Sequence, residues 1–483
     1  MISGFRIIEF SLKIFGEQDM KISLNNSNLE GSEFGATVII GENGCGKTEI
    51  LINLIKVFNF ICNIKSGKKP ISLSRSDIYY IKYYLNGDIY EINIGDCFTY
   101  KKNNEVTDIN EINLPMKFIV QSFSYGDRFP YKSDEKYKYL GTKTTSNASY
   151  ISHIENSIIE ILCCKNDKVG FNEFVSKLFK FVGLSNKFTI RYNIESYKRI
   201  DEVMANYDNF NKYYDEFLSS SRRMNYDIKK FVQQFTVMEL YERIVSLLYD
   251  HGIRNDRYEY TMYLDNNTRE DINKIKSFYS YLRLLSYMKI LSSPKVVLYK
   301  YGSEFSIEYA SSGEKQIIYS LLNIFSEIEE SSLVIIDEPE ISLHPNWQMK
   351  YMNFLEKMFI DFYNCHFVIA THSHFMISDI KKENSNIIVM NRRDEGIIAK
   401  KYDLDTFSWS AEDILYNVFS VPSNRNYYVA RDVEDVLSNI SSGKNISDDT
   451  RIKMDKLKSL LQNLKDTDPL KTIILKIMER NFD

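Results

Sequence analysis

One stretch of eight residues constrains the fold of this chain more than any other. Positions 41–48 read Gly-Glu-Asn-Gly-Cys-Gly-Lys-Thr, after the apolar run at 38–40 and before a segment at 49–65 with helical periodicity. A strand, a glycine loop and a helix form the setting in which this pattern binds phosphate. Glycines let successive backbone N–H groups turn inward, and the positive end of the helix faces the same anion. The sequence therefore predicts a phosphate site at this loop.

The residue types of the loop predict what each one contributes. Lys47 is placed to bridge the outer phosphates of a nucleotide and the Thr48 hydroxyl to hold Mg²⁺, so ATP and Mg²⁺ are the expected cofactors. Because so short a pattern also arises by chance, later motifs have to support it. The predicted nucleotide contacts in the loop are Gly41, Glu42, Asn43, Gly44, Cys45, Gly46, Lys47 and Thr48.

An acidic strand end is the second signal. Positions 333–340 read Leu-Val-Ile-Ile-Asp-Glu-Pro-Glu, which predicts a core strand followed by carboxylates. A parallel core strand carries its last residues to the crevice where ligands bind. Asp337 is placed to hold Mg²⁺, directly or through water, and Glu338 to orient or deprotonate the attacking water. The alternative, an acidic turn without function, is the weaker interpretation beside a phosphate loop.

A polar helix start precedes this strand. Ser311, Ser312, Gly313 and Glu314 open a helix predicted at 317–325. Two hydroxyls and a glycine at a helix N-terminus can bind an anion. The alternative is an ordinary helix cap made by one of the two serines, and only the position before the acidic strand favours the anion site.

A histidine follows the next predicted core strand, at 367–370. His372 is placed to contact a γ-phosphate, and the alternative is a capping or packed histidine. His374 lies two residues on, but neither a carboxylate nor a cysteine stands at ligand spacing. The pair is therefore not expected to bind zinc.

These motifs occupy both ends of the chain. Positions 148–294 are mostly helical in pattern, with extended interruptions at 188–194 and 258–264. The α/β core must then be assembled from segments on both sides of a large insertion. We expect four parts: an N-terminal part of the head at 1–147, a mainly helical insertion at 148–294, a C-terminal part of the head at 295–410 and a helical segment at 411–483.

Several shorter features are also predicted. Residues 5–15 and 21–24 alternate in polarity as two paired strands do, and Asn86-Gly87 between two alternating runs predicts a hairpin. A second hairpin is expected from 295–300 and 304–309, and a third from 386–391 and 397–402. The polar stretch 101–113 is expected to be a loop.

Composition limits the function classes. The formal net charge of −4 argues against a protein that coats nucleic acid, although a local basic patch remains compatible with it. The six cysteines form no Cys-x-x-Cys pair, which favours reduced thiols over a zinc ribbon or a disulfide framework. Neither a signal segment nor a long apolar run is found, so the expected location is the cytoplasm, without a membrane partner.

Together the motifs resemble the ATP-binding-cassette (ABC) ATPase superfamily, in the branch that holds SMC, RecF and OLD-type heads and Rad-type repair ATPases. The matching features, in chain order, are a Walker A loop at 41–48, Gln121 after a strand, a signature-like Ser-Ser-Gly-Glu-Lys-Gln at 311–316, a Walker B strand ending at 337–338 and a switch histidine at 372. The resemblance covers about 1–130 and 295–400. It departs from the transporter form of the signature, because Glu314-Lys315 stands where a glycine is usual.

The resemblance implies an ABC-type P-loop ATPase head of α/β class. It implies that Gln121 contacts the nucleotide and Mg²⁺, and that Glu338 and His372 are catalytic. It further implies a homodimer or higher homo-oligomer, in which Ser312 and Gly313 of one copy close over ATP held by the other copy.

A narrower resemblance rests on the stretches 122–130, 139–141 and 414–425. They are similar to stand-alone ATPases of bacterial anti-phage systems, nearest to the PtuA-like ATPase of Septu and of some retrons, with the AriA ATPase of PARIS similar in architecture. This implies an ATP-dependent sensor or regulator of a separate effector protein, with a PtuB-like HNH nuclease as the favoured partner.

The sequence supports other classes of function less well. A nuclease of the OLD type needs a Toprim site, with a Glu after one strand and an Asp-x-Asp after another. Glu395, Asp403 and Asp405 are too close in sequence to leave room for the intervening helix and strand, so the chain is not expected to cut nucleic acid by itself. A repair-type head that acts directly on nucleic acid stays open as the alternative, and the insertion is unlike a transporter motor.

Overall fold

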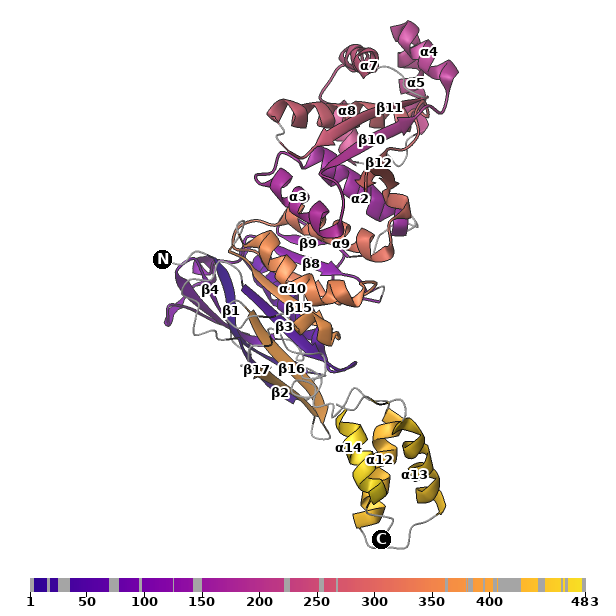
Figure 1. Ribbon diagram of the computed structural model, residues 1–483. Coiled ribbons are helices and arrows are strands. Elements are labelled where there is room, and N and C mark those ends of the chain that lie inside the picture. The colour runs from indigo at the N-terminus through magenta and orange to yellow at the C-terminus, as the bar shows by residue number, and fades with distance from the viewer. Residues whose placement is uncertain are drawn as a thin grey trace. The chain divides into compact units, whose positions relative to one another are not determined.

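The computed structural model describes residues 4–14, 18–24, 35–68, 78–94, 98–124, 126–141, 150–220, 226–251, 256–265, 268–360, 364–378, 380, 385–393, 396–402, 406, 427–441, 448–461, 464 and 468–479. The chain divides into two compact units, Met1–Phe407 and Ser408–Asp483. Figure 1 labels the elements of both units.

A seven-stranded sheet forms the centre of the first unit. Its order is β17-β16-β3-β15-β14-β8-β9, and every neighbouring pair is parallel except β16 with β17. Strands from the two ends of the chain are therefore interleaved in one sheet, as expected from the motif positions. The strands are β3 (Gly35–Gly41), β8 (Phe118–Ser122), β9 (Tyr137–Tyr139), β14 (Leu333–Asp337), β15 (His366–Thr371), β16 (Ser385–Arg393) and β17 (Gly396–Tyr402).

A six-stranded antiparallel sheet lies on the other side of helix α1 (Lys47–Lys65). Apolar side chains of α1 share one core with residues of both sheets, among them Phe5 and Tyr83 of the antiparallel sheet and Val120 and Ile335 of the parallel one. The two sheets thus enclose α1 and fix its direction. The order is β2-β1-β4-β5-β6-β7, with β1 (Phe5–Ile14), β2 (Gln18–Ser23), β4 (Ile78–Leu85), β5 (Asp88–Asn93), β6 (Thr99–Lys102) and β7 (Glu105–Thr107).

The hairpin expected at Asn86-Gly87 joins β4 to β5, and both turn residues have positive φ. The prediction of a loop at 101–113 is wrong, because this stretch contains the hairpin β6–β7 and the short 3₁₀ helix η1 (Ile109–Glu111). Asn103 and Asn104 make its turn with φ of 50° and 69°. The strands lie at the open edge of the sheet, where Val106 is 79% exposed, so they lack the apolar alternation of a strand that covers a core.

The remaining sheet of the first unit has four antiparallel strands. β10 (Lys187–Asn193) and β11 (Arg257–Tyr263) correspond to the predicted extended interruptions, and β12 (Lys295–Lys300) with β13 (Ser303–Ser306) forms the predicted hairpin. The order β11-β10-β12-β13 joins strands from both sides of residue 294. The helices around this sheet are α2 (Tyr150–Cys164), α3 (Phe171–Val182), α4 (Tyr197–Ala205), α5 (Tyr207–Ser220), α6 (Tyr226–Val232), α7 (Val237–His251) and α8 (Arg269–Tyr287).

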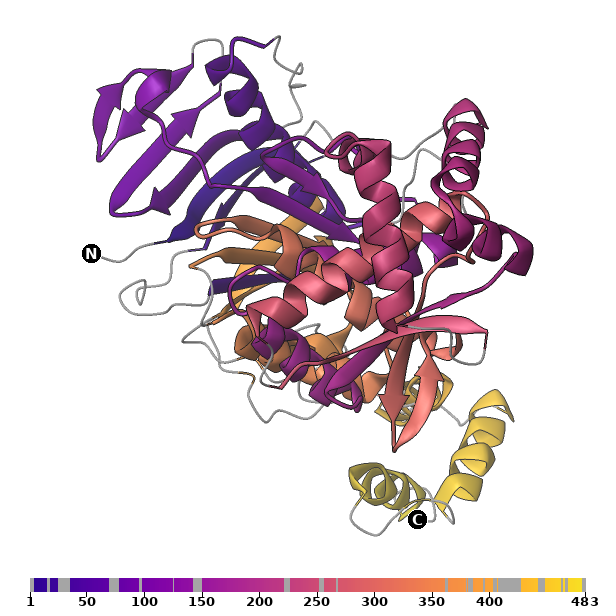
Figure 2. The same ribbon diagram turned by 90° about the horizontal axis from the view of Figure 1, so that it is seen from above.

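Two helices connect the central strands. α9 (Ser312–Glu327) precedes β14, and α10 (Pro345–Phe359) joins β14 to β15. Short 3₁₀ helices lie before α9, η2 (Ile307–Tyr309), and after β15, η3 (His374–Ile377). α9 packs on α2 and α3, and it also contacts β8 of the central sheet. This helix therefore joins the helical insertion to the central sheet (Figures 1 and 2).

The second unit contains three described helices, α12 (Tyr427–Ser441), α13 (Asp448–Leu460) and α14 (Pro469–Glu479). Val436, Leu457 and Ile474 are fully buried among them. Within the part of the chain that the structure describes, no helix is long and apolar enough to cross a membrane.

Candidate functional site

The loop 41–48 connects β3 to α1 and is held in one conformation by its glycines. Gly44 and Gly46 have φ of 78° and 89°, which residues with a Cβ rarely adopt. A Cβ on Gly41 would lie 2.2 Å from the carbonyl oxygen of Met390 in β16. The helix begins at Lys47, two residues before the predicted start, and Gly46 supplies no side-chain cap. The first N–H groups of α1 therefore have no capping side chain, and this arrangement suits an anion.

Lys47 lies at the centre of the predicted site. Its ammonium group donates to the carbonyl oxygens of Gly41 at 2.9 Å and Glu42 at 3.1 Å, and lies 2.9 and 3.0 Å from the two ring nitrogens of His372. Burial lowers the pKa of Lys47, while carboxylates from 338 and 340 act in the opposite direction. The structure thus brings together two predicted residues that are 325 positions apart.

Thr48 and Asp337 form the predicted metal pair. The Thr48 hydroxyl donates to Oδ1 of Asp337 at 3.1 Å. Burial, followed by the charge of Glu338, raises the pKa of Asp337 to about 7. A hydroxyl and a carboxylate are hard oxygen donors of the kind Mg²⁺ prefers, so the two residues fit that ion.

Glu338 directly follows β14 and has a φ of 54°. Its Oε1 lies 2.8 Å from Nε2 of His372. Burial acts to raise the pKa of Glu338, but hydrogen bonds from His372 and Glu340 lower it overall. The carboxylate is therefore kept ionised beside the lysine and the histidine, as a general base requires.

Glu340 also belongs to this cluster, although no role was predicted for it. Its Oε1 accepts a hydrogen bond from the backbone N–H of His372 at 2.5 Å. Burial, followed by its hydrogen bond with Glu338, raises the pKa of Glu340 to about 8. A protonated carboxyl group thus lies between the predicted base and the backbone of the predicted switch residue. The repeated acid in Asp-Glu-Pro-Glu is the signal that could have identified it.

Gln121 does not join the cluster. Phe118 and Val120 of β8 share the core of α1, and side chains alternate along a strand, so Gln121 points to the opposite face of the sheet. Its side chain is fully buried, and neither of its polar atoms has a hydrogen-bond partner among the described residues. Asp337 and Ser122, which are paired in register, lie on the α1 face instead. The structure therefore does not place Gln121 at the predicted metal position.

The residues 311–314 form a complete helix cap. The Ser311 hydroxyl accepts from the N–H of Glu314, and the Glu314 carboxylate accepts from the N–H of Ser311 at 2.8 Å. Glu314 also pairs with Lys300 at 2.7 Å. Ser312 is exposed, and its hydroxyl makes no hydrogen bond within the described part of the chain. The capping interpretation thus holds for Ser311 and Glu314.

Gly313 permits close packing at this helix start. A Cβ there would lie 2.9 Å from the carbonyl oxygen of Ser342, in the segment that follows β14. Among the described residues, no hydrogen bond or ion pair joins 311–314 to the loop 41–48. Within one copy of the chain, these two predicted halves are therefore not joined by a hydrogen bond or an ion pair.

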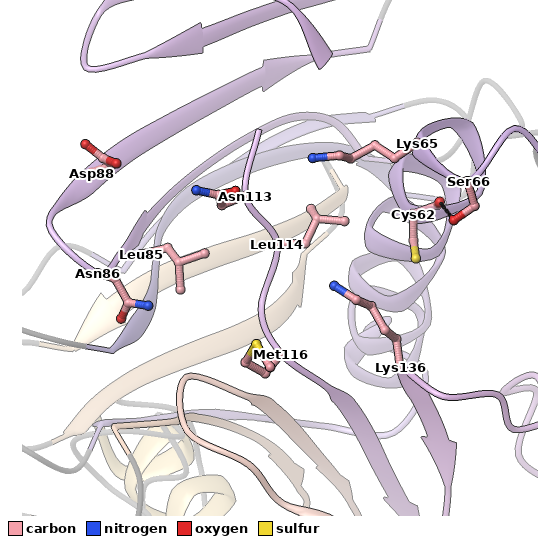
Figure 3. A pocket seen from close by; sticks show the side chains of 10 residues that line it. All are labelled: Cys62, Lys65, Ser66, Leu85, Asn86, Asp88, Asn113, Leu114, Met116 and Lys136. Carbon is pink, nitrogen blue, oxygen red and sulfur yellow. Dashed lines mark hydrogen bonds between the residues drawn. The ribbon is translucent and has the colours of Figure 1, made fainter. Parts of the chain in front are cut away.

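A cavity of about 450 Å³ lies at the other end of α1, lined in part by Lys65, Asn113 and Lys136 (Figure 3). Because α1 has 19 residues, this end lies roughly 28 Å from the loop 41–48. Lys65 donates to the carbonyl oxygens of Asn110 and Ile112, so its charge stabilises the segment before β8. The cavity is separate from the predicted nucleotide site.

Comparisons with known proteins find similarity to ATPases. The model of the AAA ATPase domain family matches residues 7–377. The retron Vc95 probable ATPase of Vibrio cholerae serotype O1 biovar El Tor is 24% identical over 384 residues, which cover 74% of this chain and 69% of the relative. The retron Ec83 probable ATPase of Escherichia coli is 26% identical over 157 residues, 30% of this chain and 28% of the relative.

A search of solved structures matched the Smc head domain of Pyrococcus furiosus bound to the C-terminal domain of ScpA, and the SMC head domain of Thermotoga maritima. The first is 14% identical with a TM-score of 0.34 and covers 82% of this chain and 96% of that one. The second is 11% identical with a TM-score of 0.31 and covers 83% of this chain and 100% of that one. The α/β fold, with its phosphate loop between β3 and α1, is that of a P-loop ATPase. Because the family model matches more than half of its length, the chain belongs to the AAA ATPase domain family.

Proposed function

We propose that this protein binds and hydrolyses MgATP and acts as the regulatory ATPase of a bacterial anti-phage defence system, controlling a separate effector. The observation that carries the ATPase part is the cluster of Lys47, Thr48, Asp337, Glu338 and His372, buried or partly buried, beside an uncapped helix N-terminus. The defence part is supported by the two relatives named as retron probable ATPases.

Each residue of the cluster has a role in this proposal. The backbone N–H groups of 41–48 and the Lys47 ammonium group bind the phosphates, and Thr48 with Asp337 would hold Mg²⁺. Bound Mg²⁺ neutralises charge on the transferred phosphoryl group. Glu338 accepts a proton from the attacking water, and His372 fixes the orientation of the Glu338 carboxylate through their 2.8 Å contact.

We further propose that two copies complete the site. The exposed Ser312 and the N-terminus of α9 make no hydrogen bond or ion pair with the described loop 41–48 of the same copy, which leaves them available to a second copy. In a two-fold arrangement, Ser312 and Gly313 of each copy would approach ATP held by the other.

Mixing two inactive variants tests the composite site. Lys47→Ala removes the phosphate contact, and Ser312→Arg blocks the partner surface, so each alone should show no ATP hydrolysis. In a mixed dimer one of the two sites has both halves intact, and partial hydrolysis should return. Absence of any recovery, together with a monomer in light scattering with ATP bound, would rule out the composite site.

The effector is proposed to be a separate protein, with a PtuB-like HNH nuclease favoured. The purified chain should accordingly leave DNA and RNA intact in the presence of Mg²⁺ or Mn²⁺. Asp403 and Asp405, the acids of the alternative nuclease site, lie outside the described residues. Metal-dependent cleavage that persists through repurification and disappears in Asp403→Ala would establish the alternative, direct action on nucleic acid.

A further inference from the structure

The segment that follows β8 passes directly beside the predicted metal pair. The N–H of Phe123 lies 3.4 Å from the carbonyl oxygen of Asp337. Arg128 contacts the carboxylate of Glu49, the residue after Thr48, at 2.5 Å. These two contacts fix Phe123 beside the end of β14 and Arg128 beside the first turn of α1.

Ser122 is the last residue of β8 and is paired in register with Asp337. Because Phe118 and Val120 face α1, alternation directs the Ser122 hydroxyl to the same face, toward Thr48 and Asp337. Ser122 is fully buried, and its hydroxyl has no hydrogen-bond partner among the described residues. Buried hydroxyls are almost always partnered, so this one indicates a ligand of the folded protein.

Asp127 supplies a carboxylate to the same place. It is 4% exposed and accepts hydrogen bonds from the Tyr139 hydroxyl at 2.6 Å and the backbone N–H of Phe129 at 3.2 Å, which fix its orientation. Phe123 and Arg128, on either side of Asp127, contact Asp337 and Glu49, so the chain carries Asp127 past the metal pair. A buried carboxylate is an oxygen donor of the kind that a hard divalent cation binds.

We propose that Ser122 and Asp127, rather than Gln121, complete the Mg²⁺ site formed by Thr48 and Asp337. All four contribute oxygen atoms, which is the ligand chemistry of a hard divalent cation. Asp127 contributes either as a direct ligand or through a metal-bound water, and Ser122 contributes its hydroxyl. The proposal rests on the proposed binding of MgATP and assigns the residues that make this binding depend on Mg²⁺.

The test measures binding rather than turnover. The affinity of the full chain for ADP is determined by calorimetry in EDTA and in Mg²⁺. The ratio of the two affinities measures how much the metal ion contributes to ADP binding. Asp127→Asn should lower this ratio about tenfold and Ser122→Ala by a smaller factor, with the affinity in EDTA retained. Matched controls are Asp108→Asn, an exposed cap residue, and Ser320→Ala, a buried serine that donates within α9.

A cysteine substitution gives a gain of function that a misfolded variant does not show. Ser122→Cys places a soft sulfur atom at the hydroxyl position, so ADP binding should become stronger in Cd²⁺ than in Mg²⁺. The same exchange at the control position, Ser320→Cys, should leave the order of the two metals unchanged.

The outcomes separate this inference from the proposed function. The assignment would be overturned if Asp127→Asn and Ser122→Ala both keep the ratio of ADP affinity in Mg²⁺ to that in EDTA. It would also be overturned if Gln121→Leu alone abolishes the gain in affinity from Mg²⁺. Both outcomes would leave ATP binding intact. Failure of the unmodified chain to bind ADP or ATP in either buffer would overturn the proposed function itself.

Discussion

The N-termini of α1 and α9 are both predicted anion sites, yet they differ in capping and in exposure. α1 begins at Lys47 after a glycine without a side-chain cap, and the buried Asp337 of β14 and the partly buried His372 after β15 lie around it. α9 begins beside a complete capping box made by Ser311 and Glu314, and its first residue is exposed. An uncapped helix start requires an external acceptor, whereas a capped one is stable without it. This difference supports our proposals that α1 binds phosphate and that α9 offers the surface for a second copy.

The largest expected effect concerns the chemistry on the α1 side. Glu338→Gln keeps the shape and hydrogen bonding of the side chain but removes the base, so ATP turnover should fall about 10²- to 10⁴-fold. ATP affinity should remain, because the phosphate contacts are unchanged. Single-turnover hydrolysis and calorimetry measure the two quantities. Unaffected turnover would show that Glu338 is not the base.

Lys47→Ala should weaken ATP binding by about 10- to 100-fold, because it removes one charge-assisted contact from the phosphates. The matched control is Lys65→Ala, in the last turn of the same helix, which should leave ATP affinity unchanged. Calorimetry measures the ATP affinity of both variants. An equal affinity of both variants and the unmodified chain would exclude the loop 41–48 as the phosphate site.

The raised pKa of Glu340 predicts that the free energy of unfolding depends on pH. Because its pKa is raised from 4.5 to about 8 in the folded state, the folded chain binds a proton that the unfolded chain has lost between these values. The stabilisation from this group is complete below pH 4.5 and is lost as the pH rises through 8. Glu340→Gln, which stays uncharged, should make the free energy of unfolding less dependent on pH across this window. Denaturant titrations at several pH values measure it, and parallel curves for both proteins would contradict the assignment.

The smallest effect separates the two serines of α9. Ser311→Ala removes the cap and should lower the free energy of unfolding by about 1 kcal/mol. Ser312→Ala should leave it nearly unchanged, because the exposed hydroxyl makes no hydrogen bond within the described part of the chain. ATP hydrolysis should show the reverse order, with Ser312→Ala the more damaging. A similar loss of stability in both variants would mean that the capping box does not distinguish them.

Much of the fold follows from local sequence patterns. The expected strands at 5–15, 333–336 and 367–370 and the Asn86-Gly87 hairpin are all found, because alternation, apolar runs and turn residues act over a few positions. The polar hairpin β6–β7 was missed, since an edge strand that covers no core has no apolar pattern to detect.

The sequence by itself determined which residue types could hold a nucleotide and at which strand ends they stand. The tertiary structure alone decided which of them meet: Lys47 with His372, 325 positions away, and Thr48 with Asp337, 289 positions away. It also decided that Gln121 faces away from α1 while Ser122 faces toward it. A strand of a parallel sheet is buried on both faces, so its sequence carries no sign of which face is which. The raised pKa of Glu340 likewise depends on burial and on one neighbouring carboxylate, and both arise only when the chain is folded.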